Sequence, residues 1–184
     1  MAKLRLRKLV DIEEAMKKFI ADYRTPPNVS LRHCKMGEWY YLRGTGKVVI
    51  PVLTFVEGGM RIPMGPVTKG YLKHFRLAPT QCTNNMFRIL GCVDALNEKM
   101  GLRLTNHDVN WCYNLQNLKE KSYYMKMRDE RLRLIQCLPD SNKGLNKDFL
   151  IISGEWHDGD PYPMVEGELG GVEGMEGHRP FASF

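Results

Sequence analysis

Residues 83–101 read TNNMFRILGCVDALNEKMG and predict a long amphipathic helix. Thr83 is a suitable N-cap residue, and Gly101 can adopt the left-handed conformation in which helices commonly end. Between them, apolar side chains recur at helical spacing and form one face: Met86, Ile89, Leu90, Val93, Leu96 and Met100. A stripe of this kind is typical of a helix that packs against a protein core.

Two shorter helices are predicted on either side of it. Pro66 is a favourable first-turn residue, and Val67, Tyr71, Leu72 and Phe75 follow at helical spacing before Leu77-Ala78-Pro79 interrupts the pattern. Thr105 and Asp108 predict the start of a short third helix, which would contain Val109, Cys112 and Tyr113. These helices would form a small central cluster.

Residues 11–23 predict an N-terminal helix. Asp11 can cap it, and Glu14 three residues later completes a capping box. Pro26-Pro27 would end it. Its apolar stripe consists of Ile12, Ala15, Met16, Phe19, Ile20 and Tyr23. Such a stripe favours core packing, and a self-association helix would use the same residues.

The strand signals lie around this helical cluster. They are found at residues 39–43, 47–50, 123–127, 132–135 and 149–152. Gly44-Thr45-Gly46 would connect the first two as a hairpin, and residues 139–142 have turn chemistry. We therefore expect an α+β fold in which a small central helical cluster packs with short antiparallel strands. Residues 1–157 would form this single domain.

Charge divides the chain into two parts. Residues 1–157 hold 26 Lys and Arg against 15 Asp and Glu, whereas residues 158–184 hold one Arg against six acids. The second part is also rich in glycine and has no apolar periodicity, so we expect a flexible, disordered acidic tail. The basic body suits a polyanion such as DNA or RNA, or an acidic partner surface. A solvated basic surface without a partner is the alternative.

The expected compartment is intracellular, either cytoplasm or nucleus. No apolar run approaches the ~18 residues of a membrane span, and the basic N-terminus is not followed by the apolar stretch of a secretory signal. No membrane partner is therefore expected. The cysteines have neither the spacing of a zinc site nor the even number of a disulfide framework: Cys34, Cys82, Cys92, Cys112 and Cys137. We expect them to be small buried hydrophobic residues.

Catalytic motifs are not recognisable in the sequence. Ser153-Gly154 lacks the preceding glycine of a nucleophile elbow, Asp140-Ser141 is followed by Asn142 rather than glycine, and the histidines are scattered. We expect a protein that is not an enzyme and uses no cofactor.

The strongest candidate for binding is a basic cluster in which cations alternate with tyrosines. Its members are Lys119, Lys121, Tyr123, Tyr124, Lys126, Arg128, Arg131 and Arg133. Cations can contact phosphates while tyrosines stack on bases. The alternative is a strand pair whose tyrosines face the core and whose lysines face water. The pattern does not distinguish DNA from RNA.

Five short signatures occur in a fixed order along more than half of the chain. They are GMRIPM at 59–64, LAPTQ at 77–81, NMFRILG at 85–91, SNKG at 141–144 and FLIISGEW at 149–156. As an ordered set over residues 47–157 they resemble the plant-specific domain of gypsy-type retrotransposon and plant transposon proteins. In Cys82 the chain departs from the aliphatic residue that usually follows the glutamine. It also lacks the zinc knuckle, protease loop and polymerase motif of a complete element.

The resemblance implies a non-enzymatic, gag-like structural or assembly protein that self-associates, and it transfers no catalytic residue. A nucleic-acid-binding module acting through its basic surface is the alternative function. Within the signatures, we expect Arg61, Arg88 and Trp156 to be architectural. Arg88 lies at the edge of its helix's apolar stripe, where it can reach backbone carbonyls or an acid, and Trp156 can close the core at a strand end.

Overall fold

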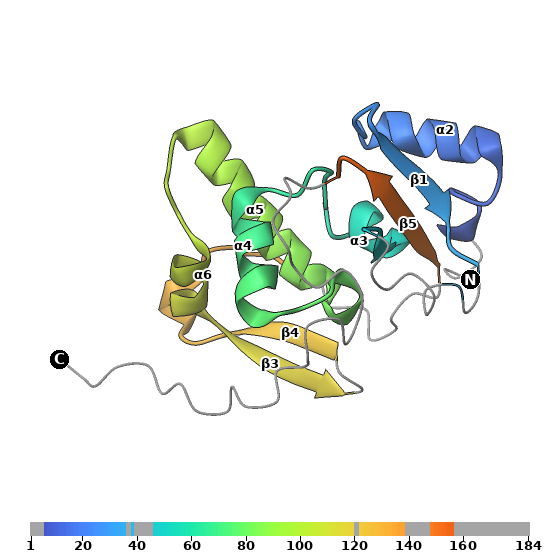
Figure 1. Ribbon diagram of the computed structural model, residues 1–184. Helices are drawn as coiled ribbons and strands as arrows, with labels where there is room; N and C mark the ends of the chain where they lie inside the picture. The colour runs from blue at the N-terminus through green and yellow to red at the C-terminus, as the bar shows by residue number, and fades with distance from the viewer. Residues whose placement is uncertain (1–5, 36–37, 39–45, 120–121, 139–147, 157–184) are drawn as a thin grey trace.

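The computed structural model describes residues 6–35, 38, 46–119, 122–138 and 148–156 (Figure 1). It confirms the α+β class, because helices pack with short antiparallel strands in two small sheets. The acidic region 158–184 and the predicted strand at 39–43 lie outside the described residues, as do the turn at 139–142 and most of the 44–46 hairpin loop.

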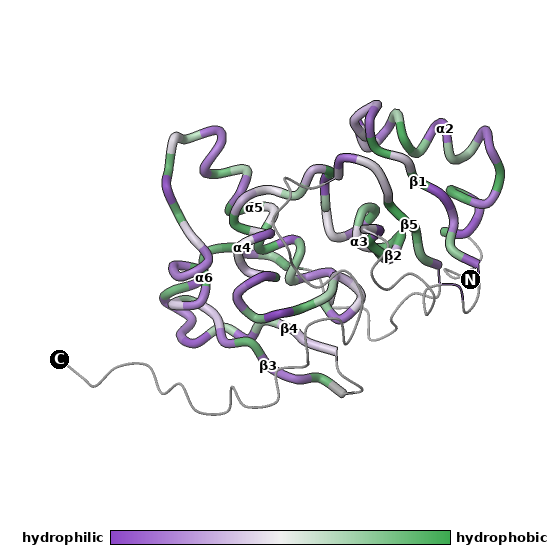
Figure 2. Tube along the Cα trace, viewed as in Figure 1, coloured by the Kyte–Doolittle hydropathy of each residue, from purple (hydrophilic) through white to green (hydrophobic). Residues whose placement is uncertain are grey.

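The first sheet places β5 (Phe149–Gly154) between β1 (Val29–His33) and β2 (Val48–Pro51), antiparallel to both. The predicted strands at 47–50 and 149–152 are confirmed, whereas β1 was not predicted. Val48 pairs with Ile152, and all of β2 is buried. In Figure 2 these strands are mainly hydrophobic, as expected of strands covered on both faces.

The N-terminal helix exists but begins later than predicted. Helix α2 spans Glu13–Asp22, its N-cap residue is Ile12, and no side chain caps it. The Asp11 capping box is therefore wrong. Glu13 and Glu14 lie in the first turn, where the helix dipole favours negative charge without a cap. Phe19 is buried against the rings of Tyr23 and Phe55, the latter from α3 (Val52–Val56).

The central helices agree closely with the sequence prediction. Helix α4 spans Pro66–Phe75, with Pro66 in its first turn, and α5 spans Asn84–Met100. The short η2 turn, Pro79–Gln81, lies between them. Gly101 follows α5 with φ of 64°, as predicted, but the Thr83 side chain forms no cap hydrogen bond and Met100 at the far end of the stripe is exposed.

Helix α6 spans Asn106–Cys112 and has the predicted capping box. Asp108 accepts hydrogen bonds from the backbone N and the hydroxyl of Thr105, both at 2.8 Å. These bonds stabilise the carboxylate and lower the pKa of Asp108. Tyr113 is not helical, because the chain turns directly into a strand there.

The second sheet is a hairpin of β3 (Tyr113–Lys119) and β4 (Ser122–Met127). Strand β4 was predicted and β3 was not. The predicted strand at 132–135 is wrong. Residues 130–132 form the short η3 turn instead, because Asp129 accepts hydrogen bonds from the backbone of Arg131 and of Leu132 and so bends the chain.

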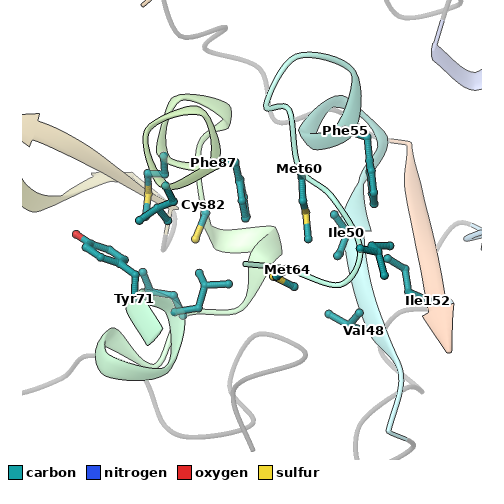
Figure 3. Packing of buried hydrophobic residues seen from close by; sticks show 14 of the residues in the cluster. Val48, Ile50, Phe55, Met60, Met64, Tyr71, Cys82, Phe87 and Ile152 are labelled. Atoms are coloured by element: carbon teal, nitrogen blue, oxygen red, sulfur yellow. The ribbon is translucent and has the colours of Figure 1, made fainter. Parts of the chain in front are cut away.

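One hydrophobic core links the two sheets through the central helices. Figure 3 shows the packed side chains Val48, Ile50, Phe55, Met60, Met64, Tyr71, Cys82, Phe87 and Ile152. The cysteine prediction is only partly confirmed. Cys34, Cys82 and Cys112 are buried, but Cys92 and Cys137 are exposed because they fall on the solvent side of α5 and after the η3 turn. Among the helices within the described residues, none has both the length and the hydropathy that a membrane span requires.

Candidate nucleic-acid interface

The β3–β4 hairpin has two chemically different faces. Side chains alternate along a strand, so Tyr123, Met125 and Met127 share one face, which packs against the core. The opposite face presents Asn114 and Gln116 of β3, Tyr124 and Lys126 of β4, and Arg128, which continues the alternation beyond the strand. We call these five residues the hairpin face. Hydrophilic residues recur along both strands in Figure 2.

This arrangement decides between the two interpretations of the basic cluster differently for each tyrosine. Tyr123 packs on the core, as the alternative interpretation predicts. Tyr124 is half-buried, pairs across the strands with Gln116 and lies on the same face as Lys126. One aromatic residue therefore accompanies the outward-facing cations.

Arg128 is held in place by α6. Its backbone N–H donates to the Cys112 carbonyl and its Nε donates to the Asn110 carbonyl, both at 2.9 Å. The last carbonyls of a helix lack partners within the helix and attract a cation. The guanidinium is thus positioned rather than mobile, and its Nη groups have no carboxylate partner in the described part of the chain.

The remaining members of the basic cluster are not equivalent. The Arg131 Nη2 lies 2.6 Å from the Asp129 carboxylate, and the shared hydrogen bonds raise the pKa of Arg131 and lower that of Asp129. Its charge is locally neutralised. Arg133 is exposed, and its Nε donates to the Met127 sulfur at 3.3 Å. Lys119 belongs to β3, while Lys121 lies outside the described residues.

A cavity of about 570 Å³ lies along the edge of β4 that does not pair with β3. The segment that follows the strand closes its other side, and its cationic lining residues are Lys126, Arg128 and Arg133. The structure therefore brings these cations together with Tyr124 along one strand.

The sequence analysis missed Trp111, which lies between the two residues whose carbonyls Arg128 contacts. Its side chain is 69% exposed although Val109 and Cys112 on the same helix are buried. A signal was present, since position 111 is out of phase with the buried positions of a helix with 3.6 residues per turn.

A second cavity, of about 380 Å³, lies between α5 and the loop that contains the GMRIPM signature. Arg88 donates to the backbone carbonyl of Glu57 and, at 2.8 Å, to the side-chain oxygen of Asn85. Its architectural role is thereby confirmed. Arg61 lines the same cavity but is exposed and forms no hydrogen bond or ion pair with any described residue, so that expectation is wrong.

Two histidines far apart in sequence meet on the surface of the helical cluster. The rings of His74 on α4 and His107 on α6 lie 5.7 Å apart between centroids. Partial burial and then the neighbouring His107 lower the pKa of His74. Within the described ranges, no group of three His, Cys, Asp or Glu side chains is placed to hold a metal ion.

The fold and this surface define an α+β protein with a cationic hairpin. Comparison of the chain with protein-family models, with curated proteins and with solved structures finds no match. The resemblance to the plant transposon domain stays a prediction.

Proposed function

We propose that the protein is a non-enzymatic nucleic-acid-binding module that acts through the hairpin face. The observation that supports this most directly is the placement of Lys126 and Arg128 on one outward face, without carboxylate partners among the described residues. Other cations of the described chain are paired on the surface, such as Lys17 with Glu13 and Lys18 with Asp22.

Contact with phosphates would supply most of the affinity. Each cation that neutralises a phosphate releases condensed counterions, so the affinity falls as salt is added, with a slope of ~0.7 to ~0.9 per phosphate. Such contacts depend little on base sequence. The acidic region 158–184 would compete for the same cations, because its charge is opposite.

The test removes two cations from the hairpin without disturbing a structural bond. Lys126→Gln with Arg133→Gln changes exposed side chains, and Arg128 is left intact because it closes the end of α6. We expect the salt slope for binding a fluorescent oligonucleotide to fall by roughly 1.4, and affinity at low salt to fall with it. Fluorescence anisotropy at several salt concentrations measures both, on the single strand and on its duplex.

The matched control is Lys17→Gln with Lys18→Gln on α2, which removes the same net charge from a helix beside the other sheet (Figure 1). It should leave the slope unchanged. If the wild-type chain binds neither oligonucleotide at low salt, or if both double variants lose the same slope, the hairpin is not a nucleic-acid site.

A gag-like assembly role is the second function we propose. It is supported by the five ordered signatures and by Met100 and Leu102, which are 65% and 43% exposed at the C-terminal end of α5. Light scattering should show a mass that rises with protein concentration, and Met100→Ala with Leu102→Ala should reduce the rise. A constant monomer mass over the whole range would rule this role out.

A further inference from the structure

We propose that the nucleic acid is single-stranded and that Trp111 stacks on one of its bases. This inference rests on the proposed function and adds the class of nucleic acid and a binding residue outside the basic cluster. Trp111 is the most exposed of the large hydrophobic side chains in the described chain, with 69% of its surface accessible.

The position of Trp111 follows from the junction between α6 and the hairpin. Val109 and Cys112 anchor α6 in the core, and Tyr113 begins β3 at once. The outward position between them therefore lies at the end of the hairpin face. An indole presents a large flat apolar surface, which water solvates poorly and which a planar base can cover.

A phosphate-binding group lies directly beside this indole. Arg128 contacts the carbonyls of Asn110 and Cys112, the two neighbours of Trp111 in the chain. Only the Nε of its guanidinium is used in these contacts, so the Nη groups remain available to a ligand. An aromatic ring next to a fixed guanidinium is the combination that holds one base and its phosphate.

The rest of the hairpin face extends the same chemistry along the strand. Lys126 lies two residues before Arg128, and Tyr124 two residues before Lys126. Asn114 and Gln116 face them across the ladder, where Asn114 pairs with Lys126 and Gln116 with Tyr124. A nucleic-acid backbone that follows β4 would therefore meet cations between two aromatic side chains, with amide groups beside them.

This geometry favours a single strand over a duplex. Bases in a duplex are already stacked on each other and offer a flat ring only their edges, whereas unpaired bases are free to stack on an aromatic side chain. The adjoining positive charge favours a polyanion over an apolar protein partner as the group that covers Trp111.

The experiment compares Trp111→Ala and Trp111→Phe with the wild-type full chain, using an oligothymidylate of roughly 16 nucleotides and a duplex of the same length as probes. We expect Trp111→Ala to weaken binding of the single strand about tenfold while the salt slope stays unchanged, because stacking releases no counterions. Trp111→Phe should restore most of the affinity. Duplex binding should be weaker and insensitive to both changes.

Intrinsic fluorescence supplies an independent readout. Stacking on a base quenches an indole, so the single strand should quench wild-type emission, and Trp111→Phe should lose that quenching while it still binds. Ile12→Ala is the control, since it truncates another exposed apolar residue, 59% accessible, on the N-terminal side of α2. It should change neither affinity nor quenching.

The outcomes separate this inference from the proposed function. If Trp111→Ala binds the single strand as tightly as the wild type, or if duplex is preferred, the stacking assignment is overturned while phosphate binding by the hairpin stands. If the wild-type chain binds neither probe at low salt, the proposed function itself fails.

Discussion

Trp156→Ala should lower the free energy of unfolding by about 3–5 kcal/mol, the cost typical of truncating a large buried aromatic side chain. Trp156 is only 2% exposed and lies just after β5. Its indole Nε1 donates to the Gly46 carbonyl at 3.0 Å, which ties the end of β5 to the turn before β2. The substitution would leave a cavity in the core and also remove this link.

Urea denaturation of the wild type and the variant measures the effect. The chain offers a matched control in Trp111→Ala, which removes the same side chain from an exposed position and should change the stability by less than about 0.5 kcal/mol. Equal losses in the two variants would show that Trp156 does not close the core.

Asp94→Ala should destabilise the protein by about 2–4 kcal/mol, the second largest effect that we expect. Helix α4 has Gly65 at its N-cap and therefore no capping side chain of its own. Asp94 of α5 supplies the missing acceptor: it receives the backbone N–H groups of Val67 at 2.8 Å and Thr68 at 3.1 Å, and the Thr68 hydroxyl at 2.7 Å.

Removal of the Asp94 carboxylate would leave these donors without a partner at the start of a helix, where a negative charge is also favoured by the helix dipole. Urea denaturation again measures the loss. Asp108→Ala is the matched comparison, because Asp108 caps α6 at an exposed position, and it should cost only about 1 kcal/mol. If Asp94→Ala costs no more than Asp108→Ala, the inter-helix cap contributes little to stability.

The elements that could be predicted from sequence are those with local signals. Helix α5 has an uninterrupted apolar stripe, α6 has the Thr105–Asp108 capping box, and β5 is a short, strongly apolar segment. Asp94 shows the limit of this reasoning. Its role as a cap depends on the packing of α5 against α4, and no pattern within either helix contains it.

Strand β3 could not be predicted for a related reason. Its sequence, YNLQNLK, is rich in amides that disfavour strands, and it follows α6 without a turn residue between them. It becomes a strand because β4 supplies a partner along its length. Conversely, residues 132–135 alternate like a strand, but the Asp129 turn directs them away from β4.

The candidate site was predicted as a set of residue types and not as a surface. Alternation in β4 alone could not show which of Tyr123 and Tyr124 faces the core, because a shift of one residue exchanges the faces. The neutralisation of Arg131 by Asp129 and the proximity of Trp111 to Arg128 both depend on the turns at the ends of the hairpin.

The most direct test of the central claim is a map of amide and indole chemical shifts in the full chain on addition of a single-stranded oligonucleotide at low salt. The account predicts that the shifts concentrate on β3, β4, Arg128 and the indole N–H of Trp111, and that they reverse when salt is added. Shifts confined to the cavity beside Arg61 and Arg88, or no shifts at all, would contradict it.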